Sequence, residues 1–210
     1  MGAEKVILFG SAPCENWDFL APLREEKPDV ICADGGIQLA LQAGFTPTAY
    51  VGDGDSGGVP PEGVPHVLLP RVKDVTDLEQ ALHYALAQGY RHIIMTGCTG
   101  GRQDHHLANL TLLEQASRQG AEARILDPTH EIRCLIGPAS LQAEGKGYRY
   151  FGLIPMDRQV TGVCIQNAKY PLQNATLVRG STLSVSNEPL QGPVTVSVEQ
   201  GAVLFLFTKE

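Results

Sequence analysis

The chain has 210 residues, of which 43% are hydrophobic and 19% are charged, and its formal net charge at pH 7 is −7. This composition is typical of a globular protein with enough apolar material for one large or two small domains. The acidic balance argues against non-specific nucleic-acid binding, which requires a basic face. The five cysteines are scattered without a C-x-x-C pair, which indicates free thiols in a reducing compartment. No apolar run suits a signal peptide or reaches the ~18 residues of a membrane span, so we predict a cytoplasmic protein.

Strand-type and helix-type segments alternate over about residues 1–127. Apolar runs typical of buried strands lie at 5–9, 29–33, 48–51, 67–69, 91–96 and 121–126. Helical spacing is found in a segment capped by Asn16, around Ile37 to Leu41, from Thr76 to Gly89, and in a segment with Leu107, Leu110 and Leu113 inside. This alternation predicts a mostly parallel sheet with helices on both faces.

Acidic residues recur where a predicted strand ends or a predicted helix begins. They are Asp34, Asp53, Asp55, Asp74, Asp77 and Asp104. In a parallel sheet these positions meet at one edge, where open α/β sheets bind their ligands. Asp53 and Asp55 in GDGDSGG would repel each other unless a cation lies between them, and Mg²⁺ bridging phosphates is the expected cation. A polar turn is the alternative for this stretch, because Asp and Gly are the commonest turn residues.

Two predicted helix N-termini carry further candidate residues. Thr76 followed by Glu79 is typical of a capping box, so Asp77 is expected at the positive end of that helix. Lys73, just before it, is either a phosphate contact or a solvated surface lysine. The stretch GGRQDHH, 100–106, combines a glycine turn, Arg102 and a helix start, which favour phosphate. Asp104 is either a substrate-side residue or the helix cap.

After about residue 128 the helical runs vanish. Short alternating segments follow instead, at 131–136, 148–154, 162–166, 182–186, 194–198 and 203–207. Closely spaced turn residues separate them, which predicts a small antiparallel β domain, either a sandwich or a barrel.

Seven motifs in this order resemble the thiamine pyrophosphokinase family. They are ADGG (33–36), GDGDS (52–56), KDVTDLEQAL (73–82), TGCTGGRQDHHLANL (96–110), FGLIP (151–155), KYPL (169–172) and SNE (186–188). The resemblance implies an α/β domain with a Rossmann-like, mostly parallel sheet over 1–128, which binds nucleotide and Mg²⁺. It also implies a thiamine-binding β-sandwich over 129–210. The implied reaction is ATP plus thiamine to AMP plus thiamine diphosphate, in a homodimer whose active site lies between subunits.

The resemblance also implies roles for individual residues, which divide into four groups. The implied metal and polyphosphate residues are Asp53, Asp55 and Asp77, the nucleotide contacts are Asp34 and Arg102, the substrate-side residues are Thr76 and Asp104, and the aminopyrimidine contacts are Ser184 and Asn187 of the partner's β domain. Asp77, Asp104 and Arg102 are expected to carry catalysis. We expect Asp77 or Asp104 to accept the proton of the thiamine hydroxyl.

Three alternatives stay open. A pyrophosphokinase for another alcohol, such as a hydroxymethylpterin, would share the first two motifs. A nucleotide-sugar transferase would account for the D-x-D pattern of Asp53 and Asp55 but not for the GGRQDH turn. A nucleotide or thiamine sensor without turnover is the non-enzyme alternative, and it rests on Gly54, which stands where the family has a bulky apolar residue.

Overall fold

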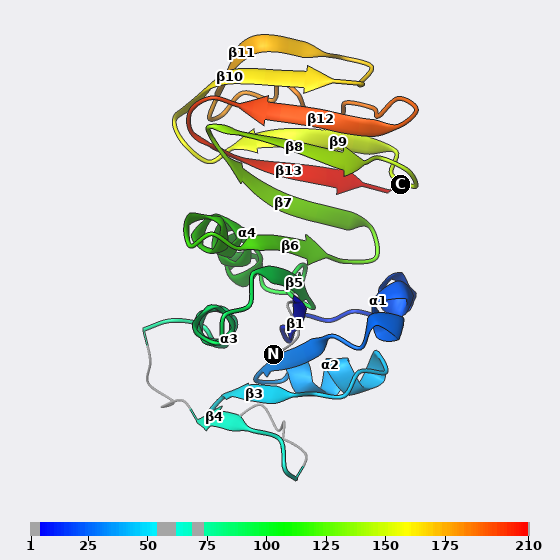
Figure 1. The fold of residues 1–210 in the computed structure, drawn as a ribbon, viewed down its shortest axis with the longest axis vertical. Coiled ribbons are helices and arrows are strands. Elements are labelled where there is room, and N and C mark those ends of the chain that lie inside the picture. Colours follow the sequence, from blue (N-terminus) through cyan, green and yellow to red (C-terminus); the bar gives the residue numbers. More distant parts are fainter. Residues whose placement is uncertain (1–4, 54–61, 69–73, 210) are drawn as a thin grey trace. The chain divides into compact units, whose positions relative to one another are not determined.

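The computed structural model describes residues 5–53, 62–68 and 74–209. The chain divides into two compact units, Met1–Pro128 and Thr129–Glu210, and each is described by itself (Figure 1). No helix in the described part of the chain is both long enough and apolar enough to cross a membrane.

The first unit contains a parallel sheet, as its alternating sequence pattern predicts. Its strands are β1 (Lys5–Phe9), β2 (Asp29–Ala33), β3 (Ala49–Gly52), β4 (His66–Leu68), β5 (His92–Thr96) and β6 (Glu122–Leu126). They lie in the order β4-β3-β2-β1-β5-β6, and every pair in this series is parallel. Strand β1 is central, and the chain proceeds from it first toward β4 and then toward β6. The topology therefore reverses between β1 and β5.

Helices cover both faces of this sheet. They are the 3₁₀ turn η1 (Asp18–Leu20) and the helices α1 (Ala21–Glu26), α2 (Gly36–Gln42), α3 (Asp77–Ala87) and α4 (Gln103–Arg118). One face packs Ile7, Phe9 and Ile94 against the buried side chains of η1, α1 and α2. The intervening strand residues point to the opposite face, where α3 packs on β1, β2 and β3 (Figure 1).

Two details of the predicted helices were wrong. Asn16 caps no long helix, because its side chain accepts a hydrogen bond from the Asp18 N–H and only a 3₁₀ turn and a six-residue helix follow. Leu107 is 63% exposed instead of inside. The buried face of α4 consists instead of Asn109, Leu112, Leu113 and Ala116, because the helix is rotated so that position 109 faces the sheet.

The second unit is built from antiparallel strands, as predicted. They are β7 (His130–Ile136), β8 (Ala139–Glu144), β9 (Tyr150–Pro155), β10 (Gln159–Gln166), β11 (Leu172–Val178), β12 (Pro193–Val198) and β13 (Ala202–Thr208). Strands β7, β13 and β9 pair in this order, and β11, β10, β12 and β8 form a second sheet. The core combines apolar residues of both groups and contains Phe151, Phe205 and Phe207, whose rings are in mutual contact.

The strand predicted over 182–186 is wrong, since this segment consists of turns. Ser184 and Ser186 have φ angles of 80° and 59°, and a backbone in this left-handed region cannot continue a strand. Strands β8 and β11 were not predicted, because their exposed positions interrupt the alternation of apolar residues.

Candidate functional site

A cleft of about 1020 Å³ lies at the carboxyl ends of the parallel strands in the first unit. Its walls are the turn 10–13 after β1, Ala33 and Asp34 after β2, the segment 74–79 at the start of α3, and residues of 97–102 after β5. His105 and Asn109 of α4 complete it. This is the position between β1 and β5 where the topology reverses, and open α/β sheets bind ligands at such points.

Glycines allow the backbones around the cleft to approach one another. The amide of Gly10 donates to the Thr96 carbonyl over 2.8 Å, and Ala12 donates to the Gly97 carbonyl over 2.7 Å. A Cβ atom on Gly10 would lie 2.6 Å from the Gly97 oxygen. The same atom on Gly36 would lie 2.2 Å from the Phe9 oxygen. The turns after β1 and β5 and the start of α2 are therefore in direct backbone contact.

Asp34 is fixed at the end of β2 by a buried tyrosine. Its residue exposure is only 9%, and its φ angle of 47° lies in the left-handed region. Such a conformation costs free energy and persists only where the surroundings enforce it. The buried hydroxyl of Tyr50 donates to Asp34 Oδ1 over 3.2 Å, and the Asp34 amide donates to the Val51 carbonyl. The carboxylate is thus presented to the cleft in one orientation.

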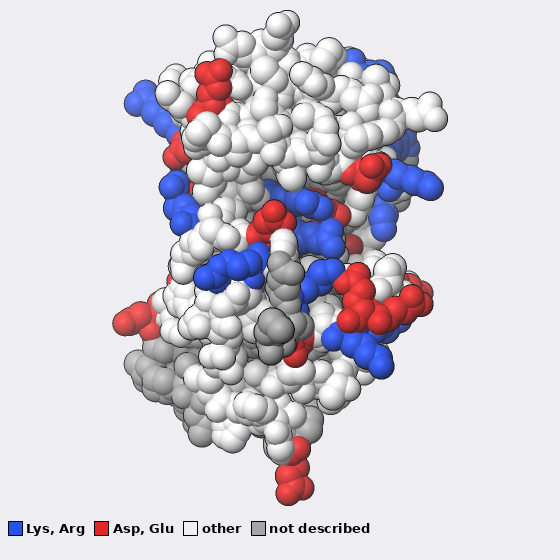
Figure 2. Space-filling view, in the orientation of Figure 1, with Lys and Arg blue, Asp and Glu red and all other residues white. Residues whose placement is uncertain are grey.

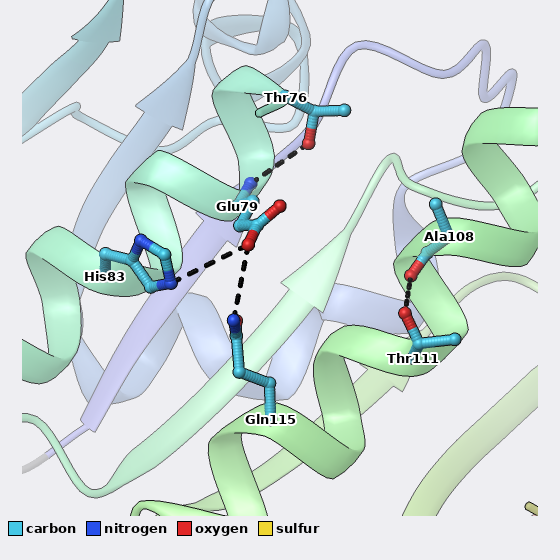
Figure 3. A network of polar contacts seen from close by, with 6 residues as sticks. All are labelled: Thr76, Glu79, His83, Ala108, Thr111 and Gln115. Atoms are coloured by element: carbon cyan, nitrogen blue, oxygen red, sulfur yellow. Dashed lines mark hydrogen bonds and ion pairs between the residues drawn. The ribbon is translucent and has the colours of Figure 1, made fainter. Parts of the chain in front are cut away.

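The N-terminus of α3 lines the cleft, but its predicted capping box is only half formed. Thr76 caps the helix by accepting from the Glu79 amide over 3.3 Å. The Glu79 carboxylate does not return to the cap and instead accepts from Gln115 Nε2 of α4 over 3.3 Å (Figure 3). His83 Nε2 lies 3.8 Å from the same oxygen. Glu79 therefore connects α3 to α4, the two helices whose N-terminal ends line the cleft.

The N-terminus of α4 carries an exposed ion pair. Arg102 occupies the N-cap position and donates to Asp104 over 2.6 Å. This hydrogen bond lowers the pKa of the Asp104 carboxyl to about 2, and it raises the pKa of the Arg102 guanidinium. Arg102 lines the cleft, whereas Asp104 is not among its described lining residues. The turn itself is held by His106, whose Nδ1 accepts from the Gly100 amide over 3.2 Å.

The remaining predicted site residues lie in other places. Asp53 directly follows β3 and is half-buried. Asp55 and Lys73 lie outside the described residues. In the second unit, Ser184 Oγ donates to the Leu153 carbonyl over 3.1 Å. Asn187 is buried and holds the backbone of Tyr170, accepting from its amide and donating to its carbonyl.

Three residues around the cleft were not predicted as site residues. Tyr50 resembles an ordinary apolar strand residue, and its role depends on the left-handed turn at Asp34. His105 lines the cleft, whereas only Arg102 and Asp104 were named as candidates in the stretch 100–106. Nothing in the sequence marks Asn109 as a site residue, since it is only a polar residue two positions after Leu107. The rotation of α4 about its axis brings it to the wall of the cleft.

Acidic and basic side chains lie side by side on the face shown in Figure 2 instead of in separate regions of one sign. The net charge of −7 therefore does not form one acidic surface on that face. The electrostatic field at a ligand depends mainly on the residues nearest to it, because charges more than about 8–10 Å apart in water are screened.

A switch-point cleft with two helix N-termini, an arginine and several carboxylates is typical of enzymes that transfer phosphate-containing groups. Comparisons with known proteins narrow this class. Residues 20–125 match the family model described as the thiamin pyrophosphokinase catalytic domain, and residues 139–203 match that of the thiamin pyrophosphokinase vitamin B1 binding domain. The chain belongs to the thiamine pyrophosphokinase family, whose members are enzymes.

Individual relatives agree with this assignment. Thiamine pyrophosphokinase of Bacillus subtilis is 31% identical over 183 residues, which cover 84% of this chain and 85% of the relative. A crystal structure of the enzyme from the same organism has a TM-score of 0.87 at 28% identity and covers 98% of this chain and 99% of that chain. The structure from Geobacillus thermodenitrificans has a TM-score of 0.84 at 30% identity and covers 98% of both chains.

Proposed function

We propose that this chain transfers the pyrophosphoryl group of ATP to the hydroxyl of thiamine, giving AMP and thiamine diphosphate, in the cleft of the first unit. One observation carries the proposal, namely that α3 and α4 direct their N-termini into the same cleft, beside positive-φ glycines at 100 and 101. Helix N-termini and such turns favour anions. The strand order around the cleft agrees with a Rossmann-like nucleotide-binding unit.

The chemistry of transfer suits this architecture. Transition states of phosphoryl transfer are loose, so catalysis consists mainly of positioning and of neutralising charge. Arg102 and the N-terminal ends of α3 and α4 are suited to hold the polyphosphate, and Asp34 to orient the nucleotide. Thr76 has a committed cap hydrogen bond, so we assign it to shaping the cleft wall. Lys73 is proposed as a further phosphate contact.

We propose Mg²⁺ as the metal, held by Asp53, Asp55 and Asp77. These donors are all carboxylate oxygens, which fits a hard cation. Among the described residues no three potential ligands lie close enough to hold a metal by themselves, so the proposed set depends on Asp55. When bound, Mg²⁺ would neutralise the charge on the phosphates, and this explains how an acidic cleft can accept an anionic substrate.

Asp77 is the stronger candidate for the proton acceptor. Asp77 lines the cleft, whereas Asp104 is not among the described lining residues and its carboxylate is paired with Arg102. We therefore assign Asp104 to positioning Arg102. Asp77→Asn is expected to lower kcat by a factor of about 100 or more, since it removes the proposed base, which contributes about 10²–10⁴-fold, together with a proposed Mg²⁺ ligand. Asp104→Asn should lower kcat less and raise the KM for ATP, and wild-type kcat in Asp77→Asn would refute the assignment.

The test of the function is a product assay with ATP, Mg²⁺ and thiamine that resolves AMP from ADP. Equal amounts of AMP and thiamine diphosphate are expected. Formation of ADP would show that a single phosphate is transferred and would contradict the proposal. Nucleotide binding without any thiamine-dependent product would favour the pterin alcohol, tested next with the same assay, or the sensor.

We further propose a cytoplasmic homodimer in which Ser184 of the partner subunit contacts the thiamine, while Asn187 of the partner subunit, which is buried and bonded to Tyr170 in the chain described, holds the backbone beside it. If each site combines two subunits, mixing Asp77→Asn with Ser184→Ala should regenerate some fully active sites. Light scattering should give twice the 22.6 kDa mass of the chain. A monomeric mass, or no recovery of activity in the mixture, would contradict this assembly.

A further inference from the structure

Asn109 is a buried amide in the wall of the cleft. It lies on α4 and is only 7% exposed. Its Nδ2 donates to the backbone carbonyl of Cys98 over 2.8 Å. Its Oδ1 makes no hydrogen bond with any described residue. It also does not belong to the described side-chain oxygens that are both inaccessible to solvent and without a partner. Since Asn109 lines the cleft, this oxygen opens to the space that a ligand would occupy.

The orientation of the amide is fixed. The Cys98 carbonyl can only accept a hydrogen bond, so the NH₂ group of Asn109 must face it and the oxygen must face the other way. Reversing the amide would set two oxygens against each other. Because this oxygen opens to the cleft, water can hydrate it in the free protein, and a ligand that displaces this water loses affinity unless it supplies a donor in its place.

The surroundings of this oxygen indicate what kind of group fits. Asn109 lies seven residues after Arg102, about 10 Å along the helix axis. The phosphate-binding features lie at the N-terminal end, where the side chain of Arg102 is 72% exposed. Cys98, which Asn109 contacts, is buried and uncharged, and so is Leu78 among the other lining residues of the cleft. A phosphate has no donor for Oδ1, whereas a flat apolar ring carrying an amino group matches both the neutral lining and the acceptor.

We propose that Asn109 Oδ1 is a specificity determinant that accepts a hydrogen bond from the exocyclic amino group of a heteroaromatic ring. The proposal rests on the proposed function, whose two substrates both carry such a group. The group belongs either to the adenine of ATP or to the aminopyrimidine of thiamine. In both cases an analogue with an oxo group in place of the amine sets oxygen against oxygen and is rejected. Asn109 thus selects the substrate by its donor and takes no part in the chemical step.

The experiment compares kcat/KM for matched substrate pairs, namely ATP against ITP and thiamine against its 4′-oxo analogue. Two variants of Asn109 separate the donor end of its amide from the acceptor end, and a third variant is the control. Asn109→Leu removes both ends. Asn109→Asp keeps an acceptor toward the cleft but loses the donor to Cys98 and sets its second oxygen against that carbonyl, so this variant is expected to be less stable. Gln115→Leu is the matched control, because it replaces another amide on α4 that is not among the described lining residues. Thermal unfolding verifies that each variant is folded, and competition of ATP and ITP for a fluorescent nucleotide measures binding without turnover.

In the wild type, the amino substrate of one pair is expected to be preferred at least tenfold. Asn109→Leu should reduce that preference about tenfold, as loss of one hydrogen bond implies, and Asn109→Asp and Gln115→Leu should keep it. The pair that responds identifies the ring. The inference is refuted if neither pair responds, or if Asn109→Leu and Asn109→Asp change the ratio equally, since that result would mean only the Cys98 bond matters. If the wild type forms no product, the proposed function fails, and the competition assay still decides whether Asn109 reads the nucleotide.

Discussion

Replacing Gly36 with alanine tests the backbone contact that fixes the cleft. The added Cβ would lie 2.2 Å from the Phe9 oxygen and 2.9 Å from the Gly10 oxygen. Ordinary contacts begin at about 3.4 Å, so the start of α2 must move by about 1.2 Å (3.4 − 2.2). Overpacking of this kind costs about 1–3 kcal/mol, whereas alanine regains at most about 1 kcal/mol of helix propensity. Both obstacles are backbone oxygens, so we take the upper end of this cost, about 3 kcal/mol, and expect a net loss of about 2 kcal/mol in unfolding free energy. We also expect a higher KM for ATP, because Asp34 lies two residues before Gly36.

The assay is urea denaturation followed by the fluorescence of Trp17, the single tryptophan, which lies in the core of the first unit beside Phe9. Gly89→Ala is the control. Gly89 has a φ angle of 93° and no atom within 4 Å of an added Cβ, so this variant should lose about 1 kcal/mol through backbone strain alone and keep its KM. Unchanged stability and KM in Gly36→Ala would refute the reasoning.

Three further predictions concern individual hydrogen bonds around the cleft. Tyr50→Phe removes a buried donor to the Asp34 carboxylate and should lower the unfolding free energy by about 1.5–3 kcal/mol, measured by the same fluorescence; no loss would contradict the bond. The pKa of Asp104 in the folded protein is lowered to about 2 from 3.8, so the Arg102 pair is complete above pH 4 and is lost as the pH falls through 2. A carboxyl NMR titration should show this midpoint, and Arg102→Gln should raise it. Thr76→Ala should cost about 1 kcal/mol through loss of the helix cap, and Thr76→Ser should keep most of this stability.

The succession of elements could be predicted from the sequence. Apolar runs such as 5–9 and 29–33 are typical of strands buried on both faces, and the change to short alternating segments after residue 128 predicts antiparallel strands. Periodicity predicts which residues share a face but not the angle at which a helix settles on the sheet. That angle decided the position of Leu107, which is exposed, and it directs Asn109, Leu112, Leu113 and Ala116 to the buried face instead.

The carboxylates of the cleft could be predicted from the sequence, because an acidic residue at the end of a strand usually indicates either a ligand site or a turn. Asp34, Asp74 and Asp77 do line one cleft. The hydrogen-bond partners of individual side chains could not be predicted in the same way. Thr76 and Glu79 predict a reciprocal capping box, but Glu79 turns to Gln115, a residue of another helix. A local motif gives the partners that a side chain can reach, and tertiary contacts decide which of them it takes.

Neutral polar residues in apolar surroundings are the hardest part of such a site to predict. An acid at a strand end stands out, whereas Tyr50 within β3 and Asn109 within α4 share their segments with core residues. The structure shows their importance, because a hydrogen bond within the protein fixes the side chain of each of these two residues beside the cleft. Charged residues can attract either substrate over some distance, but a fixed neutral acceptor distinguishes an amino group from an oxo group at contact. Binding strength and specificity can therefore reside in different residues of the same cleft, and only the structure locates the second set.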